Sequence, residues 1–381
     1  AAATALRCAG AGLDTLIMST DPAHSLADAL DLPLGPLASP VAEHLWGQQL
    51  DAAARLEEVW ADVQAYLLEV LAWAGVGAIE AEELSVVPGL DEVFALADIR
   101  DAATSGAWDV VVVDCAPTAE TLRLLSLPDV LSWYMERVFP MGRRVSRIVG
   151  PVLSRLSSVP VAGDPVFAAV ARFYDRLAGV RELLTDPART SVRLVVNPER
   201  MVIAEARRTH TYLSLFGYRI DAIVANRLLP DAITDPWFTA WKEAHVEHLA
   251  TIEEGFAPVP VLRATLAGEE LVGIERLAAF GEDVYGDLDP ASCLHEGAPF
   301  TLERRGETTV LRLHLPGAEA DDLELGQRQD ELLVRVGPYR RAMVLPDSLR
   351  RRPVLDAKLR DGYLELHFGS RPEVPRAEAA G

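Results

Sequence analysis

Short apolar runs alternate with helix-like segments along most of this chain, and this alternation restricts its possible folds more than any other feature. Strands are predicted at 13–19, 110–113, 193–196, 220–225 and 259–263, and helices at 1–12, 199–216, 237–256 and 269–280. The four consecutive valines at 110–113 are typical of a parallel strand covered on both faces. Such alternation predicts a doubly wound, mostly parallel sheet over 1–288. Asn226 is expected to end the strand that begins at Ile220.

Two long segments interrupt this alternation. Residues 56–96 and 127–180 are rich in Leu, Val, Trp and Met at helical spacing, which indicates a helical subdomain. The pattern changes again near Pro290, where alternating runs at 309–315, 331–336, 340–345 and 363–368 are separated by Pro-Gly, Gly-Pro and Asp-Gly turns. We therefore expect a linker at 289–297, a small all-β sandwich at 298–369 and a disordered tail at 370–381.

Charge and cysteine content exclude several classes of protein. The chain has 381 residues and a formal net charge of −21, with the acidic excess confined to 1–297. Strong negative charge disfavours nucleic acid as a partner. No uncharged apolar run approaches the ~20 residues that span a bilayer, so a transmembrane protein is not expected. Three scattered cysteines without a Cys-x-x-Cys pair favour a reducing cytoplasm.

Two acids each follow an apolar strand. Asp21 comes after the strand that ends at Ser19, and Asp114 directly follows the four valines. Ligands of open α/β sheets bind beyond the carboxyl ends of the strands. In P-loop nucleotide hydrolases, one such Asp holds the Mg²⁺ shell and a switch segment positions the attacking water. A strand-end Asp also commonly caps the next helix, so the pattern alone leaves both readings open.

The surrounding residues carry a more specific resemblance. The segments STDPAHSL (19–26) and DCAPTAETLRLL (114–125) resemble the two switch signatures of the ArsA/Get family. That family comprises arsenite-pump ATPases and the ATPases that target tail-anchored membrane proteins. The resemblance continues through 88–99, 195–208 and 224–230, and so covers nearly all of 1–285. It implies a P-loop NTPase-type fold, ATP and Mg²⁺ as cofactors, a cytoplasmic location and a homodimer.

The resemblance also implies roles for individual residues. Asp21 would orient or deprotonate the attacking water, and Asp114 would hold Mg²⁺ through its shell. Asn226 would contact adenine, with Arg227 beside it. Pro198 and Glu199 lie in a segment that closes over the nucleotide in this family. The remaining residues implied are those of the two switches, Pro22, His24, Ser25, Pro117 and Thr118.

Some positions depart from the family pattern. Cys115 stands where Thr is usual, Ala119 and Glu120 where Gly and His are usual, and Thr265 where Pro is usual near adenine. The glycine-rich phosphate loop ending in Gly-Lys-Thr-Thr is absent, because the only lysines are Lys242 and Lys358. We expect the first strand and this loop to belong upstream of Ala1, so residues 1–381 alone should be inactive. The alternative is that the protein has lost this loop.

Three functions follow as alternatives. The first is an ATPase that couples nucleotide state to a hydrophobic client or a membrane-protein partner. A client groove would involve Trp133, Met135 and Phe139, although helical periodicity alone favours an ordinary core for these residues. The second is an ATPase that drives arsenite or antimonite efflux, which the scattered Cys8, Cys115 and Cys293 disfavour. The third is a non-hydrolysing binding or scaffold protein.

Two further features are treated as binding or surface elements. The C-terminal segment around Leu315-Pro316-Gly317 resembles the α-crystallin-type small heat-shock domain that is appended to bacterial ArsA-like ATPases. It holds no acid, His or Ser cluster that suggests catalysis, so a binding role is expected. His245 and His248 are three residues apart, a spacing more typical of a polar helix face than of a metal site.

Overall fold

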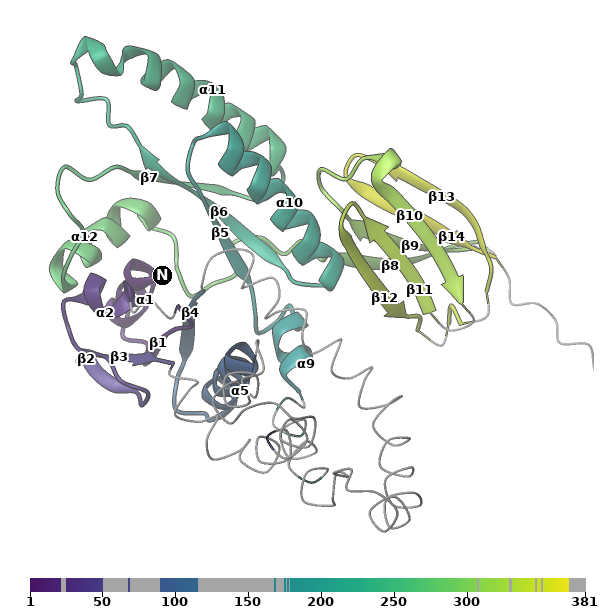
Figure 1. Ribbon diagram of the computed structural model, residues 1–381, viewed down its shortest axis with the longest axis horizontal. Coiled ribbons are helices and arrows are strands. Elements are labelled where there is room, and N and C mark those ends of the chain that lie inside the picture. The colour runs from purple at the N-terminus through teal and green to yellow at the C-terminus, as the bar shows by residue number, and fades with distance from the viewer. Residues whose placement is uncertain are drawn as a thin grey trace, which may run out of the picture. The chain divides into compact units, whose positions relative to one another are not determined.

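A computed structural model describes residues 1–21, 25–50, 90–115, 179–306, 308–328, 331–346, 348–350 and 352–369, with Leu68, Ala168, Asp175 and Leu177 as single positions (Figure 1). Its contacts divide the chain into two compact units. The first unit is Ala1–Leu183 with Glu269–Ala291, and the second is Leu184–Gly268 with Ser292–Gly381. Most of the predicted helical insertions and the tail at 370–381 lie outside the described residues. The predicted domain boundaries stay predictions.

The first unit contains a four-stranded sheet in the order β2-β3-β1-β4. Its strands are β1 (Thr15–Ser19), β2 (Ser39–Ala42), β3 (Leu45–Gln49) and β4 (Val110–Asp114). β1 pairs parallel with β3 and β4, and β2 pairs antiparallel with β3. The prediction missed β2 and β3, which form a short hairpin whose turn places His44 at a φ of 56°. Neither strand has the long β-branched run that identified β4.

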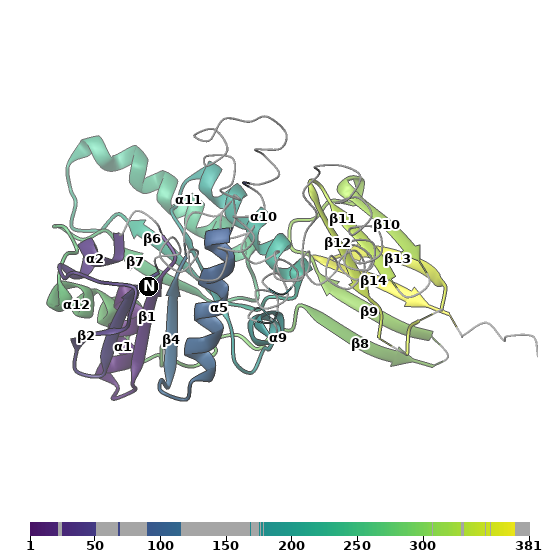
Figure 2. The ribbon, with the colours of Figure 1, turned by 60° about the horizontal axis from the view of Figure 1, so that its bottom comes forward.

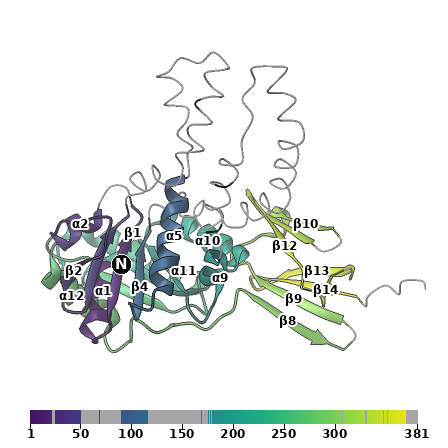
Figure 3. The same ribbon diagram turned by 90° about the horizontal axis from the view of Figure 1, so that it is seen from below.

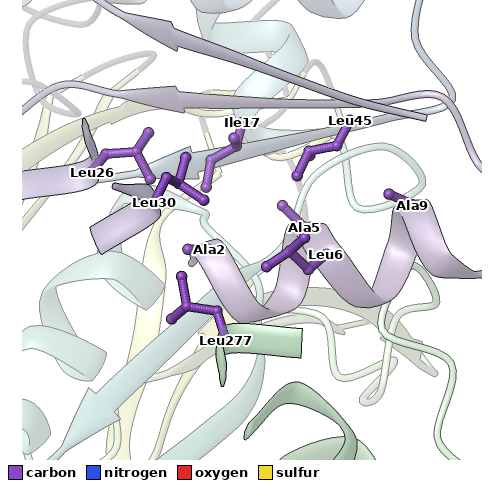
Figure 4. Close-up of a cluster of buried hydrophobic side chains, with 9 residues drawn as sticks. All are labelled: Ala2, Ala5, Leu6, Ala9, Ile17, Leu26, Leu30, Leu45 and Leu277. Carbon is purple, nitrogen blue, oxygen red and sulfur yellow. The ribbon is translucent and has the colours of Figure 1, made fainter. Parts of the chain in front are cut away.

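Helices cover both faces of this sheet. Because side chains alternate along β1, its residues pack against helices on each side. Ile17 packs among Ala5, Leu6 and other residues from α1 (Ala2–Gly10), α2 (Ser25–Leu30) and α12 (Ile274–Tyr285), as Figure 4 shows. Leu16 and Met18 face the other way, toward Ile99 of α5 (Leu90–Thr104). Figure 2 shows β1 and β4 side by side between α1 and α5. The doubly wound prediction is confirmed, although the valines of β4 are half-buried rather than fully covered.

Close packing between α1 and α12 fixes both helices. A Cβ added to Gly281 would lie 2.8 Å from the carbonyl oxygen of Ala3, so only glycine fits there without a shift. The hydroxyl groups of Thr4 and Tyr285 form a 2.8 Å hydrogen bond across the same contact. Full burial of each leucine or isoleucine in this core contributes roughly 1.5–3 kcal/mol, whereas the alanines of α1 contribute less and allow close approach to β1.

The second unit contains a parallel sheet in the order β5-β6-β7, which are Val192–Val196, Ile220–Leu228 and Val261–Thr265. Its helices are α9 (Val180–Thr185, which begins in the first unit), α10 (Arg200–Phe216), the 3₁₀ turn η1 (Pro236–Phe238) and α11 (Thr239–Gly255). α10 and α11 lie against the sheet (Figure 1). Asn226 does not end its strand as predicted. β6 runs on to Leu228 through a register shift against β7, and Arg227 there has a φ of 58°.

The C-terminal part of the second unit is the predicted all-β sandwich. Its elements are β8 (Phe300–Arg305), β9 (Thr308–His314), η2 (Ala320–Asp322), β10 (Leu323–Arg328), β11 (Glu331–Val336), β12 (Tyr339–Val344), β13 (Val354–Arg360) and β14 (Tyr363–Phe368). Antiparallel sheets in the orders β10-β11-β12 and β13-β14-β9-β8 face each other (Figure 3). Buried residues alternate along β11 and β14, which made these strands predictable. β8, β10 and β13 are largely exposed and lack that signal.

Within the described parts of both units, the helices are too short or too polar to cross a membrane.

Candidate active site

The carboxyl ends of β1 and β4 bring two acids to one edge of the first sheet. β1 and β4 are parallel neighbours, and Ser19 is paired in register with Asp114. The N–H of Thr20 donates to the carbonyl oxygen of Asp114 at 3.0 Å, so the chain leaving β1 stays against the end of β4. Asp21 therefore follows directly at the edge where Asp114 lies.

Asp21 is held by the hydroxyl groups of two residues, one before it and one after it in the sequence. The Ser25 hydroxyl donates to Oδ2 of Asp21 at 2.6 Å, and the N–H of Asp21 donates to Oγ of Ser19 at 3.2 Å. The first bond is charge-assisted and short, so it fixes the carboxylate more firmly than a neutral bond would. The switch residues Pro22 and His24 lie outside the described residues.

Gln49 is a site residue that the sequence reasoning missed. Its side chain is 1% exposed at the end of β3, and its Nε2 donates to the carbonyl oxygen of Asp21 at 2.7 Å. Its Oε1 is buried and has no hydrogen-bond partner among the described residues. A buried amide is costly unless it is bonded, so Gln49 is expected to position Asp21. The available signal was a Gln-Gln pair that closes a short apolar run.

The two acids influence each other electrostatically. Burial raises the pKa of Asp114, and the carboxylate of Asp21 adds to that rise. The amino-terminal end of α1 lies close to Asp114. Two partly desolvated carboxylates that repel each other form an environment that a bound cation stabilises. Oxygen ligands of this kind suit Mg²⁺, so the residues present fit that ion.

The second unit holds the residues expected at the nucleotide base. Asn226 is half-buried within β6 and Arg227 is exposed. Pro198 is buried, and the exposed Glu199 is the N-cap residue of α10. Their predicted contacts with nucleotide stay predictions.

His245 has a structural partner, because its Nδ1 accepts a 3.3 Å hydrogen bond from the N–H of Leu229. No group of three His, Cys, Asp or Glu side chains suited to a metal ion occurs in the described ranges. The predicted residues Pro117, Thr118, Trp133, Met135 and Phe139 lie outside those ranges.

A mostly parallel sheet covered by helices on both faces, with acids beyond two neighbouring strand ends, defines a doubly wound α/β protein with a binding site at the carboxyl edge of its sheet. Residues 1–286 match the family described as anion-transporting ATPase, and residues 306–368 match the HSP20-like domain found in ArsA. The chain belongs to the anion-transporting ATPase family. Both parts of the predicted resemblance are confirmed.

Relatives cover most of the chain. A protein of Prosthecochloris vibrioformis named "Putative arsenical pump-driving ATPase" is 37% identical over 370 residues, or 96% of this chain and 91% of that protein. A protein of the same name from Chlorobaculum tepidum is 36% identical with the same coverage. A similarly named protein from Aquifex aeolicus is 33% identical over 92% of this chain and 91% of its own length.

Proposed function

We propose that this protein hydrolyses ATP with Mg²⁺ and couples its nucleotide state to a hydrophobic client or a membrane-protein partner. One observation carries the hydrolytic part: Asp21 and Asp114 lie beyond the ends of paired strands, close enough for Asp21 to raise the pKa of Asp114. The amino-terminal end of α1 points to the same place. A helix N-terminus attracts phosphate, so this edge combines phosphate affinity with two acids.

The acids have separate roles in this proposal. Asp21 orients the attacking water and accepts its proton, while the Ser25 hydroxyl and the Gln49 amide keep Asp21 in place. Asp114 would hold Mg²⁺ through its water shell. When bound, Mg²⁺ neutralises charge on the phosphates that are being cleaved. Asp114 is partly desolvated, and a nearby cation would favour its charged form.

Adenine is assigned to the second unit. Asn226 offers both a donor and an acceptor to a base edge, and Arg227 follows it. Pro198 and Glu199 would close over the nucleotide. The switch roles of Pro22, His24, Ser25, Pro117 and Thr118 belong to the same proposal.

Catalysis also needs lysine and backbone N–H groups around the phosphates, yet the 381 residues contain no Gly-Lys-Ser or Gly-Lys-Thr. We expect these residues alone to turn over ATP slowly. The test compares them with the full-length gene product, including any residues encoded ahead of Ala1. Equal turnover in the two proteins would contradict the need for a separate phosphate loop. No turnover in either, with nucleotide still bound, would favour a non-hydrolysing binding protein.

An arsenical pump motor is the second candidate, favoured by the names of the relatives. Stable capture of a metalloid needs several converging thiolates. Cys8 is buried, whereas Cys115 and Cys293 are exposed. We expect arsenite to leave ATP turnover unchanged. Stimulation by arsenite that disappears in a protein with all three cysteines replaced by serine would establish the pump motor instead.

The client is proposed to bind a groove that includes Trp133, Met135 and Phe139, in a cytoplasmic homodimer. Nucleotide can control a client only if the client binds the two nucleotide states with different affinity. An apolar peptide should therefore bind differently in ADP and in a non-hydrolysable ATP analogue. Substituting the three residues with serine should weaken binding without lowering the melting temperature. A large fall in melting temperature would make them core residues, and equal affinity in both nucleotides would remove the coupling.

A further inference from the structure

The C-terminal half of α10 is enclosed within the second unit. All eight residues from Thr209 to Phe216 are buried. The Thr211 hydroxyl bonds to the carbonyl oxygen of Pro316, and the Arg341 guanidinium bonds to the carbonyl oxygen of Leu215. The sandwich is therefore packed onto this helix through specific polar contacts. These contacts fix the space between α10 and the sandwich.

Three histidines and two aromatic rings form a continuous cluster beside this helix. His210, which is 2% exposed, stacks on Phe256 with ring centroids 5.7 Å apart and meets His314 edge-on at 5.3 Å. His314 in turn lies 4.7 Å from the ring of Tyr363. His295, from the segment before β8, lowers the pKa of both His210 and His314.

A cavity of about 20 Å³ opens beside this cluster. The side chains that line it with polar groups are His210, Ser214, Tyr218, Arg219, His295, His314 and Tyr363. None of its lining residues is an Asp or a Glu, in a chain that holds 57 acidic residues. The volume suits about one or two water molecules or the terminal group of a larger ligand.

Two buried nitrogen atoms at this cavity have no hydrogen-bond partner among the described residues. They are Nδ1 of His210 and Nε of Arg219. A buried polar atom left without a partner is costly, so such atoms often mark a place where a water molecule, ion or ligand binds. Arg219 contributes the fixed positive charge of the cavity, and its guanidinium geometry suits oxygen pairs of carboxylate and phosphoryl groups.

His210 and His314 are neutral at physiological pH. Burial, together with the neighbouring His314 and His295, lowers the pKa of His210 to about 3. Burial likewise lowers the pKa of His314 to about 4, with His295 adding to the effect. Among the described residues, Arg312 lies 4.6 Å over the Tyr363 ring, and Glu365 pairs with Arg312 at 2.9 Å. An anion beside the rings would favour their protonation.

We propose that this cavity binds a small oxyanion, a phosphoryl or carboxylate group, between α10 and the sandwich, with Arg219 as its charged partner. The lining has no carboxylate, and its histidines are not arranged as a group suited to a metal ion within the described ranges, so an anion fits this cavity better than a cation. The bound group also adds hydrogen bonds between α10 and the sandwich, so it stabilises their contact.

Thermal melting of the 381-residue chain at pH 7 tests the site. Inorganic phosphate and acetate are titrated separately, with chloride at equal ionic strength as the reference. At ten times its Kd, the bound anion should raise the Tm by about 2 °C. Arg219→Gln and His295→Gln should each abolish the rise, whereas Arg328→Gln, an exposed arginine on β10, should retain it. A rise of the same size in Arg219→Gln would overturn the proposal.

A second readout does not depend on melting. In a long-range ¹H–¹⁵N spectrum of the eight histidines, phosphate should raise the pKa of His210 in the wild type but not in Arg219→Gln. Glycerol 2-phosphate identifies the source of the group: the same response means that a larger ligand can present it, and a response to inorganic phosphate alone means a closed ion site. Unchanged histidine titration with all three anions would contradict the site. Asp21→Asn should keep the full response, so failure here is separate from failure of the ATPase proposal.

Discussion

The hydroxyl group of Ser25, the first residue of α2, donates a 2.6 Å hydrogen bond to Oδ2 of Asp21, so the helix itself holds the acid that follows β1. Because the bond orients Asp21 rather than binding nucleotide, Ser25→Ala should lower kcat about 3- to 10-fold with little change in KM. Steady-state ATPase assays of the full-length gene product measure both constants. Ser39→Ala, which removes a hydroxyl bonded to Gly47 in the same sheet, is the matched control and should leave kcat unchanged. An equal loss in both variants would argue against a special role for Ser25.

Gln49 should act on the same acid through the backbone. Gln49→Leu keeps the size of the side chain but removes the donor to the carbonyl oxygen of Asp21, so kcat should fall about tenfold while nucleotide affinity persists. Gln48 offers a close comparison, since it is also buried on β3 but donates to the carbonyl oxygen of Pro36. Gln48→Leu should affect stability without affecting kcat in the folded protein. If Gln48→Leu reduces kcat as much as Gln49→Leu, the positioning role is wrong.

Stability should fall in mild acid because of His210. The pKa of His210 is lowered to about 3 in the folded chain from an ordinary value of 6.5, so the unfolded chain binds a proton first as pH falls. The neutral His210 contributes its full stabilisation above about pH 6.5. Below that pH the free energy of unfolding falls by up to about 1.4 kcal/mol per pH unit. Urea unfolding at pH 7, 6 and 5 measures the slope. His210→Phe keeps an aromatic ring beside Phe256 and should reduce the slope to the part that comes from His314, whose pKa is also lowered, whereas His248→Gln on α11 should not reduce it. A wild-type slope equal to that of His210→Phe would contradict this prediction.

Gly281 should tolerate no larger residue. Gly281→Val places methyl groups against the Ala3 carbonyl and Arg7, which should cost about 1–3 kcal/mol through overpacking. Gly268→Val meets open space and serves as the control. The difference in free energy of unfolding between the two variants, from urea titration, checks the effect. Equal stability of the two would mean that α12 moves freely away from α1.

Much of the fold could be predicted because its signals were local. The valines of β4, the glycine that ends α10 and the alternation in β11 and β14 each reflect a regular pattern of burial. β2 and β3 were missed because SPVA and LWGQQ contain Pro, Gly and Gln in place of a β-branched run, whereas other strands of similar length were predicted. Asn226 was misplaced because a register shift lets β6 continue past it.

The candidate site divides in the same way. Asp21 and Asp114 could be predicted, since each follows a recognisable strand and a family-like switch sequence. Gln49 could not, because an amide is recognised as a site residue only when its burial and its bond to Asp21 are known. The cavity beside His210 likewise depends on residues from α10, the segment before β8, β9 and β14, which no sequence pattern connects.

The most direct test of the central claim is the rate of Mg²⁺-dependent ATP hydrolysis by the full-length gene product and its Asp21→Asn variant, measured together with nucleotide Kd. Orientation of water matters in the transition state and not for holding phosphate, so the variant should lose at least about 100-fold in kcat while Kd changes less than about 3-fold. A variant that loses nucleotide affinity as strongly as turnover would make Asp21 a structural residue. A variant that hydrolyses ATP at the wild-type rate would contradict the proposed mechanism.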